Sequence, residues 1–453
     1  MRAVVMKFGG SSVVDATAID RVASIVAGER SRGRAPVVVV SALGGVTDSL
    51  LALAERARTG ASHADLENGI AGLRRRHVDE AARLGADRDG TLLPFLDGHF
   101  DELQAAMDEI ARRRSADPAL MDIIAAAGEL LSSRLVAAAL AVRNFPSVWV
   151  DAREVVVTND SHTCAIPLMD ETAAAAVAAI EPLVSDGRIP VLGGFVGRTV
   201  EGVTTTLGRG GSDYSASLVG AAIHAVEIQI WTDVDGMLTA DPRIVDDAEV
   251  VRHLSFAEAA ELAYFGAKIL HPASIWPAQT YKVPVKLLNT MQPDAKGTTI
   301  SEIAESVGVK AVAAKDNITA IRIKSSRMLL AYGFLRKIFE VFEKYRTPID
   351  MITTSEVAVS LTIDHTTNLK DILKELEPFG SIEVDKDQVI ISVVGNEISQ
   401  TRDIIKKLFG SIVNIPVRMV SYGGSPHNIS LLVSAKNKTK ILQQLNKGMF
   451  GLD

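Results

Sequence analysis

The chain has 453 residues, which at roughly 150 residues per domain predicts about three domains. Hydrophobic residues make up 47% and charged residues 23%, so a globular protein with a sizeable core is expected and a disordered chain is excluded. The net charge of 48 − 55 = −7, with only 5% aromatic residues, argues against a nucleic-acid partner. The single cysteine, Cys164, excludes an intramolecular disulfide framework and any multi-cysteine metal site.

The N-terminal residues 2–10 predict a short buried strand that runs into a turn, and they are too quickly polar for a secretory signal. The most apolar predicted helix, around residues 125–142, contains Glu129 and Arg134, and no run of 18 residues is free of charge. We therefore expect a cytoplasmic protein with no membrane partner.

The first 300 residues alternate apolar strands with amphipathic helices. Besides the strand within residues 2–10, strands are predicted at 37–40, 148–150, 189–192, 229–232 and 283–288, and helices at 16–32, 48–57, 119–140, 171–183, 213–223 and 256–264. The continuous run Val37–Val40 is typical of a strand that is covered on both faces. This alternation predicts an α/β domain with a mostly parallel sheet. Residues 60–118 instead predict charged helices with solvated faces, including the triplets Arg74–Arg76 and Arg112–Arg114.

Composition changes near residue 300. Residues 1–300 contain 23 Arg and 5 Lys, whereas residues 301–453 contain 6 Arg and 14 Lys, which indicates that the two parts have different sequence histories. The tail carries a weak internal repeat of strands and helices, with each unit roughly βαββα and 60–75 residues long. We therefore expect two small α+β modules in tandem.

Three motifs carry chemistry, and none of them is a P-loop. The first is Lys7-Phe8-Gly9-Gly10-Ser11-Ser12, where a lysine at a strand end precedes two glycines and a helix. Glycines let backbone N–H groups approach an anion, and the lysine can place a charge on a phosphoryl group. The alternative is a plain strand–turn–helix with serine caps.

The second motif is Thr204–Asp213, in which a polar strand enters a glycine turn that opens a helix. Arg209 suits bidentate recognition of a carboxylate. Asp213 is either a helix N-cap or the residue that orients Lys7.

The third motif is Trp231–Arg243, followed by Phe265–Pro272, which contains Lys268. Three loops with cations and glycines after strand ends predict a nucleotide at the carboxyl edge of the sheet.

In this order and spacing, the motifs resemble the amino acid kinase fold and specifically the aspartokinase family, over essentially the whole chain. The strings Asp350–Val357 and Ser421–Asn428 resemble the regulatory ACT modules of that family, and the pattern is most similar to its monofunctional, lysine-sensitive type. The resemblance implies a catalytic domain at 1–300, a first ACT module at 317–386, and a second made of 303–316 and 387–453. We expect no homoserine dehydrogenase domain, so the monofunctional rather than the bifunctional form of the family is expected.

The implied reaction is transfer of a phosphoryl group from ATP to the side-chain carboxylate of L-aspartate, the first step of the aspartate-derived amino acid pathway. Since that carboxylate is the nucleophile, catalysis is expected to be positioning and charge neutralisation. By resemblance, Lys7, Asp213 and Lys268 are the catalytic residues. The residues implied to bind aspartate are Ser41, Thr47, Glu129, Arg209 and Ser212.

Glu129 and Thr47 each have a second interpretation. Glutamate in an alanine-rich helix is usually at the surface, but the neighbouring turns are apolar, so Glu129 is expected to face inward and to need a cation. Thr47 could instead be a helix N-cap.

The nucleotide is implied to contact Lys7, Gly9, Gly10, Thr232, Asp233, Arg243 and Lys268. The family often has Tyr where this chain has Leu238, which leaves the role of that position open. Mg²⁺ is expected with ATP, held mainly by phosphate oxygens and water, and no protein metal ligand is predicted.

The implied effector site in the tail comprises Met328, Gly333, Phe334, Leu335, Asp350, Ser355 and Glu356. Lysine is the expected effector, an acidic residue such as Asp350 or Glu356 could hold its ammonium group, and the modules are expected to pair chains into a homodimer or homotetramer. The alternative is that the modules pack without a ligand.

Two other functions compete with this one. Glutamate or acetylglutamate kinases resemble the Lys7 region but usually lack the two-module tail. A non-catalytic amino-acid sensor is disfavoured because Lys7, Arg209, Asp213 and Lys268 are all present.

Overall fold

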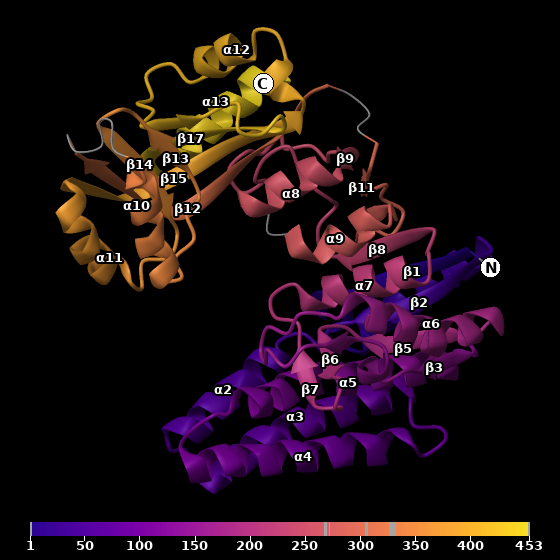
Figure 1. The fold of residues 1–453 in the computed structure, drawn as a ribbon. Coiled ribbons are helices and arrows are strands. Elements are labelled where there is room, and N and C mark those ends of the chain that lie inside the picture. The colour runs from indigo at the N-terminus through magenta and orange to yellow at the C-terminus, as the bar shows by residue number, and fades with distance from the viewer. Residues whose placement is uncertain (1, 267–269, 271, 304–306, 326–331, 452–453) are drawn as a thin grey trace. The chain divides into compact units, whose positions relative to one another are not determined.

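The computed structural model describes residues 2–266, 270, 272–303, 307–325 and 332–451. The chain divides into two compact units (Figure 1). Unit 1 is Met1–Gly236 with Leu270–Glu302, and unit 2 is Met237–Ile269 with Ile303–Asp453. Residues 237–269, which the sequence analysis assigns to the catalytic domain, thus group with the C-terminal part of the chain.

Unit 1 contains the alternating strands and helices that the sequence predicts. Its elements are β1 (Arg2–Phe8), η1 (Gly10–Val13), α1 (Ala16–Ser31), β2 (Arg34–Val40), α2 (Val46–Thr59), α3 (His63–Leu84), α4 (Leu92–Arg113), α5 (Pro118–Val142), β3 (Ser147–Trp149), η2 (Ala152–Glu154), β4 (Val157–Thr158), α6 (Met169–Ser185), β5 (Ile189–Gly193), β6 (Val196–Thr199), β7 (Thr204–Thr206), α7 (Gly211–Ala222), β8 (Glu227–Thr232), α9 (Pro272–Thr280), β10 (Val285–Asn289) and β11 (Thr298–Ser301). The small sheet β4-β6-β7 and the helix α9 were not fully anticipated, because these segments are short and carry little periodicity.

The main sheet of unit 1 has the strand order β3-β5-β2-β1-β8-β10-β11. All its pairs are parallel except that of β10 with β11, so the predicted mostly parallel sheet is confirmed. In β1, Val4, Met6 and Phe8 belong to the large core cluster that also contains residues of α1 and α5. Because side chains alternate along a strand, Val5 and Lys7 face the other side of the sheet, toward α7. The sequence thus directs Lys7 away from the main core.

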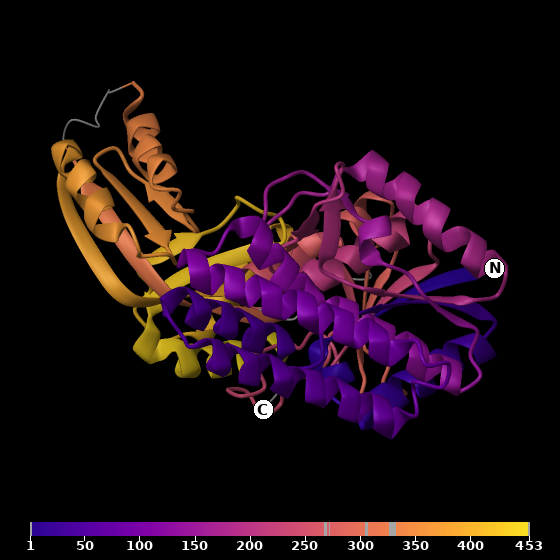
Figure 2. The ribbon, with the colours of Figure 1, turned by 90° about the horizontal axis from the view of Figure 1, so that it is seen from below.

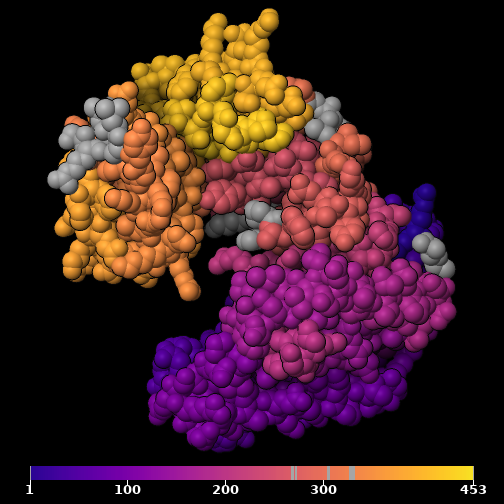
Figure 3. Space-filling view, in the orientation of Figure 1, coloured from indigo at the N-terminus to yellow at the C-terminus, as the bar shows by residue number. Residues whose placement is uncertain are grey.

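The helices α3 and α4 account for the charged region 60–118, and they lie on the outside of unit 1 in both ribbon views (Figure 1, Figure 2). Arg74, Arg75, Arg112, Arg113 and Arg114 are exposed, as the sequence predicts for solvated faces. In Figure 3 the side chains of this region form a closely packed layer along the lower edge of unit 1.

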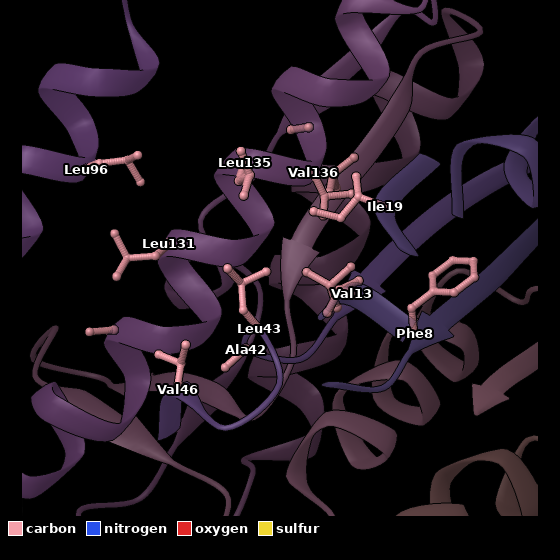
Figure 4. Close-up of a cluster of buried hydrophobic side chains, with 14 of the residues drawn as sticks. Phe8, Val13, Ile19, Ala42, Leu43, Val46, Leu96, Leu131, Leu135 and Val136 are labelled. Atoms are coloured by element: carbon pink, nitrogen blue, oxygen red, sulfur yellow. The ribbon is translucent and has the colours of Figure 1, made fainter. Parts of the chain in front are cut away.

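Helix α5 runs through the core of unit 1. Among the described residues it is the one helix long and apolar enough to cross a membrane, but 83% of its most apolar window is buried inside the protein, as is usual for a core helix. Figure 4 shows Ala42 and Leu43, from the loop after β2, and Val46, the first residue of α2, beside Leu131 and Leu135 of this helix. These buried contacts dock the loop onto α5.

Unit 2 contains β9 (His253–Ser255), α8 (Phe256–Tyr264), β12 (Gly308–Lys324), α10 (Phe334–Lys344), β13 (Ile352–Thr354), β14 (Ala358–Ile363), α11 (Leu369–Leu376), η4 (Glu377–Phe379), β15 (Ser381–Asn396), η5 (Ile398–Gln400), α12 (Ile404–Ser411), β16 (Met419–Ser421), β17 (Asn428–Ser434), η6 (Ala435–Asn437) and α13 (Lys438–Phe450). Its antiparallel sheet has the order β13-β14-β12-β15-β17-β16.

The two predicted modules share long strands. The strands predicted separately at 381–384 and 388–394 are one 16-residue strand, β15. It pairs with the 17-residue β12 from Gly308↔Asn396 to Lys324↔Ser381. The first part of β12 pairs with the second half of β15, from Gly308↔Asn396 to Lys315↔Ile390. Two separate cores, one with α10 and α11 and one with α12 and α13, form along this shared sheet.

Candidate active site

Loops at the carboxyl edge of the main sheet enclose a cavity of about 250 Å³ in unit 1. Its lining residues are Lys7, Ser41, Thr47, Glu129, Phe195, Gly208, Gly210, Gly211, Ser212 and Asp213. Parallel strands end at the same edge of a sheet, so the loops after β1, β2 and β5 meet here although they are far apart in sequence. Six of the eight residues that the resemblance assigns to catalysis or aspartate binding, apart from Arg209 and Lys268, line this one cavity.

Lys7 and Asp213 form an ion pair in the cavity. Nζ of Lys7 lies 2.7 Å from Oδ1 of Asp213, and their side chains are 11% and 13% exposed. Asp213 stands in the first turn of α7, where the helix dipole favours a negative charge. The N-cap of α7 is Gly210, so the N-cap interpretation of Asp213 is wrong. Asp213 instead holds the ammonium group of Lys7 at the N-terminus of α7.

Glu129 is the buried acid of the site. It is 5% exposed, and its Oε2 has no hydrogen-bond partner among the described residues. Burial raises the pKa of Glu129 from 4.5 to about 8, although a backbone hydrogen bond from Ala42 and the charge of Lys7 act in the opposite direction. The side chain is therefore mostly neutral at pH 7, and it has a free oxygen for a cationic ligand group.

The helix α5 approaches the site closely because a glycine precedes Glu129. A Cβ added to Gly128 would lie 2.8 Å from Cβ of Ala42, closer than carbon atoms pack. Oγ of Ser132, one turn further along, donates to the carbonyl oxygen of Ser41 at 2.7 Å. Glu129 is thus held against the loop after β2.

The glycine turn between β7 and α7 forms one wall of the cavity. Gly208 and Gly210 adopt the left-handed conformation with φ of 72° and 73°, which glycine tolerates without strain. Arg209 lies in sequence between these two lining residues and is exposed, but it is not itself among the residues that line the cavity. The first residues of α7, Gly211 and Ser212, also line the cavity, which gives this wall the positive potential of a helix N-terminus.

Thr47 and Phe195 complete the lining. Thr47 lies in the first turn of α2, whose N-cap is Gly45, so its interpretation as an N-cap is wrong. Phe195 was missed in the sequence, although Gly193-Gly194-Phe195 follows a buried strand much as Gly9 and Gly10 do. Its φ of 68° is unusual for a bulky residue, and its N–H donates to Oγ of Ser215 at 2.9 Å.

The residues predicted to bind the nucleotide are only partly brought together. Gly9 donates its N–H to the carbonyl oxygen of Trp231 at 3.1 Å, so the glycine turn lies beside the end of β8, where Thr232 and Asp233 follow. Gly10 has no side chain, so the backbone of this turn is uncovered there. A Cβ at this position would lie 3.3 Å from the carbonyl oxygen of Ala42.

Arg243 belongs to unit 2, where it forms a bidentate pair with Asp241. Lys268 and Met328 lie outside the described residues. Among the residues that are described, no group of three or more His, Cys, Asp or Glu side chains gathers in the manner of a metal site.

The predicted effector residues lie in unit 2. Gly333 is the N-cap of α10, with Phe334 and Leu335 half-buried behind it, and Ser355 and Glu356 are exposed in the turn between β13 and β14.

Asp350 is not free in this structure. Its side chain is 1% exposed, and its Oδ1 lies 2.5 Å from Nζ of Lys315, which also pairs with Asp364 at 2.8 Å. Tyr264 donates its hydroxyl to the same Asp350 oxygen at 3.2 Å. Burial raises the pKa of Asp350 in spite of Lys315, and Oδ2 has no partner among the described residues. An effector ammonium would therefore have to use Oδ2 or displace Lys315.

Comparisons with known proteins identify the family of the chain. The model of the amino acid kinase family matches residues 2–289, and an ACT domain model matches residues 391–449. The lysine-sensitive aspartokinase 3 of Escherichia coli is 35% identical over 99% of this chain and 99% of its own. The crystal structure of E. coli aspartokinase III in complex with aspartate and ADP matches with a TM-score of 0.85. The structure of the same enzyme in complex with lysine and aspartate matches with a TM-score of 0.81. The two crystallised chains are 34% and 35% identical to this chain, respectively. Each match covers 99% of this chain, and it covers 100% and 99% of the two crystallised chains. The chain therefore belongs to the aspartokinases of the amino acid kinase family.

Proposed function

We infer that this protein is an aspartate kinase, which transfers the γ-phosphoryl group of ATP to the side-chain carboxylate of L-aspartate and releases ADP and 4-phospho-L-aspartate. The observation that carries the inference is the cavity in which the Lys7–Asp213 pair lies with the buried, mostly neutral Glu129. An amino acid with two carboxylates and one ammonium group fits this set of charges.

The residues supply positioning and charge rather than a base. The attacking oxygen of aspartate is already anionic at pH 7, so no protein group has to remove a proton from it. Lys7 neutralises charge on the phosphoryl group during transfer, and Asp213 fixes the ammonium of that lysine. Glu129 gives up its proton when the ammonium of aspartate arrives, and the resulting pair anchors the substrate.

Arg209 is assigned to a substrate carboxylate. It stands between two glycines of the cavity wall, and a guanidinium binds a carboxylate with two parallel hydrogen bonds. Ser41, Thr47 and Ser212 add hydroxyl groups around the same space.

Mg²⁺ is expected to accompany ATP, and the residues present fit a metal held by phosphate. Asp213 is already paired with Lys7, and the described residues contain no group of three or more acidic, histidine or cysteine side chains that could hold a metal ion. Phosphate oxygens and water would therefore supply the ligands, and the bound metal would neutralise phosphate charge. The bare backbone at Gly9 and Gly10 suits the approach of the nucleotide phosphates.

Lysine is the proposed effector, and a cytoplasmic homodimer or homotetramer joined through unit 2 is the proposed form of the enzyme. The related E. coli enzyme has been crystallised with lysine, which supports this choice. An inhibitor must bind the inactive state more tightly than the active one to act in this way.

The test is ADP release with aspartate, glutamate and N-acetylglutamate as separate acceptors, with the acyl phosphate trapped as its hydroxamate. We expect turnover with aspartate as acceptor but not with glutamate or N-acetylglutamate. We expect lysine to inhibit this turnover, and threonine or methionine to have little effect on it. Preference for glutamate or acetylglutamate would replace the proposed activity by another amino acid kinase activity. Lysine binding without any turnover would favour the sensor.

A further inference from the structure

Asp122 is a buried carboxylate that none of the chemistry above uses. It lies on α5 and is 0% exposed, yet it does not cap the helix, because the N-cap is Asp117. Oδ1 accepts the hydroxyl of Thr206 at 2.5 Å, and both oxygens accept the backbone N–H of Thr163, at 3.0 and 3.1 Å. Oδ2 also lies 2.7 Å from Nδ1 of His162. A carboxylate without solvent needs such partners, and here they come from two other segments of the chain.

Both segments lead to the substrate cavity. Thr206 is the last residue of β7, two positions before the lining residue Gly208. The second segment pairs with the same strand end, because Ala165 donates its N–H to the carbonyl oxygen of Thr206 at 2.8 Å. A Cβ added to Gly208 would lie 3.1 Å from Sγ of Cys164, so the cysteine packs directly behind the glycine turn.

The second segment is also strained. Thr163 has φ of 68°, a conformation that a β-branched residue adopts only when its surroundings hold it there. Its N–H points at Asp122, so the carboxylate stabilises the strained turn that supports Cys164.

Asp122 precedes Glu129 by seven residues, about two helical turns, so both acids lie along the same side of α5. We propose that Asp122 is a positioning residue for substrate binding: through Thr206 and Thr163 it holds the turn that carries Arg209 at a set distance from Glu129. The two ends of the amino-acid substrate then meet groups that are already in place, which lowers the cost of ordering them on binding. The identity of the substrate rests on the proposed function, whereas the fixing of the turn does not.

The kinetic test uses Thr206→Val and Asp122→Asn, with Thr205→Val as the matched control. Thr205 is as buried as Thr206 and stands next to it, but its hydroxyl pairs with Thr158 at 2.7 Å. Loss of one buried hydrogen bond to a charged group predicts a KM for aspartate raised about tenfold, with the KM for ATP unchanged. The control is expected to keep the wild-type KM for aspartate.

A purely structural role would lower the melting temperature of both variants and leave the KM for aspartate as it is, which overturns the proposal. If Asp122→Asn fails to fold, Thr206→Val carries the same test, since valine has nearly the shape of threonine.

Cys164 gives a readout that needs no activity. It is exposed and is the only cysteine in the sequence, so an aromatic disulfide reagent reports the rate at which its thiol reacts. Both variants remove a hydrogen bond that holds the turn, so we expect the Cys164 thiol to react about tenfold faster in them than in the wild type or the control. If the wild type phosphorylates no aspartate, the proposed function fails while this rate still tests the role of Asp122. Equal rates in all four proteins would refute it.

Discussion

The clearest test of the site is the substitution Glu129→Gln, which removes the charge and keeps the size of the side chain. Between pH 4.5 and about 8 the folded protein holds a proton on Glu129 that the unfolded chain releases. The free energy of unfolding of the wild type therefore falls as pH rises through this window. At about 1.4 kcal/mol per pH unit, the gap between 4.5 and about 8 corresponds to about 4–5 kcal/mol as an upper bound.

The glutamine variant has no proton to lose at this position. Its stability is expected to equal that of the wild type near pH 5 and to exceed it by a few kcal/mol near pH 9, as measured by urea unfolding at each pH. Aspartate binds Glu129 only after its proton leaves, so the affinity of the wild type for aspartate should rise by up to about tenfold per pH unit below pH 8. The variant should lose this dependence and bind aspartate about 30- to 100-fold more weakly. A stability difference that is the same at every pH, or an unchanged KM for aspartate, would refute the reasoning.

Three further substitutions probe the lysine of the cavity and two buried positions of unit 1, Gly128 and His77. Lys7→Ala is expected to lower kcat about 10³-fold or more with little change in the circular dichroism spectrum, because it removes the cation that Asp213 holds at the phosphoryl path. Retention of full turnover would contradict the role of Lys7. Gly128→Ala should lower the free energy of unfolding, measured by chemical denaturation, by about 1–3 kcal/mol, because the added Cβ would lie 2.8 Å from Cβ of Ala42. Adding Ala42→Gly to the same chain should restore most of this free energy. Burial lowers the pKa of His77 from 6.5 to about 4. The free energy of unfolding of the wild type should therefore fall by up to about 3 kcal/mol as pH falls from 6.5 to about 4, whereas that of His77→Gln should not. Equal acid sensitivity of the two proteins would be the contrary result.

Much of the secondary structure was readable from local patterns. The run Val37–Val40 predicted a strand covered on both faces, and the helix 256–264 was predicted at the bounds that the structure has. Such patterns depend only on which neighbouring residues are apolar, and a strand or helix repeats them with a fixed period. Short elements such as β4 and β6 lack enough residues to show a period, and they were not predicted as strands.

The sequence also names the chemical groups of the site, because lysine, arginine, glycine and acidic residues in three motifs predict a nucleotide at the edge of the sheet. The reaction itself was implied by the resemblance of these motifs to the aspartokinase family. Three properties came only from the tertiary structure. The pKa of Glu129 depends on burial by segments far from it in sequence. Phe195 lines the cavity because of where β5 lies in the sheet, and Asp122 meets Thr206, 84 residues away, only in the folded chain. Likewise, 381–384 and 388–394 became one strand because β12 extends alongside both. Local periodicity reports the surroundings of a residue along the chain, whereas charge states, cavity walls and strand pairing depend on residues brought together across it.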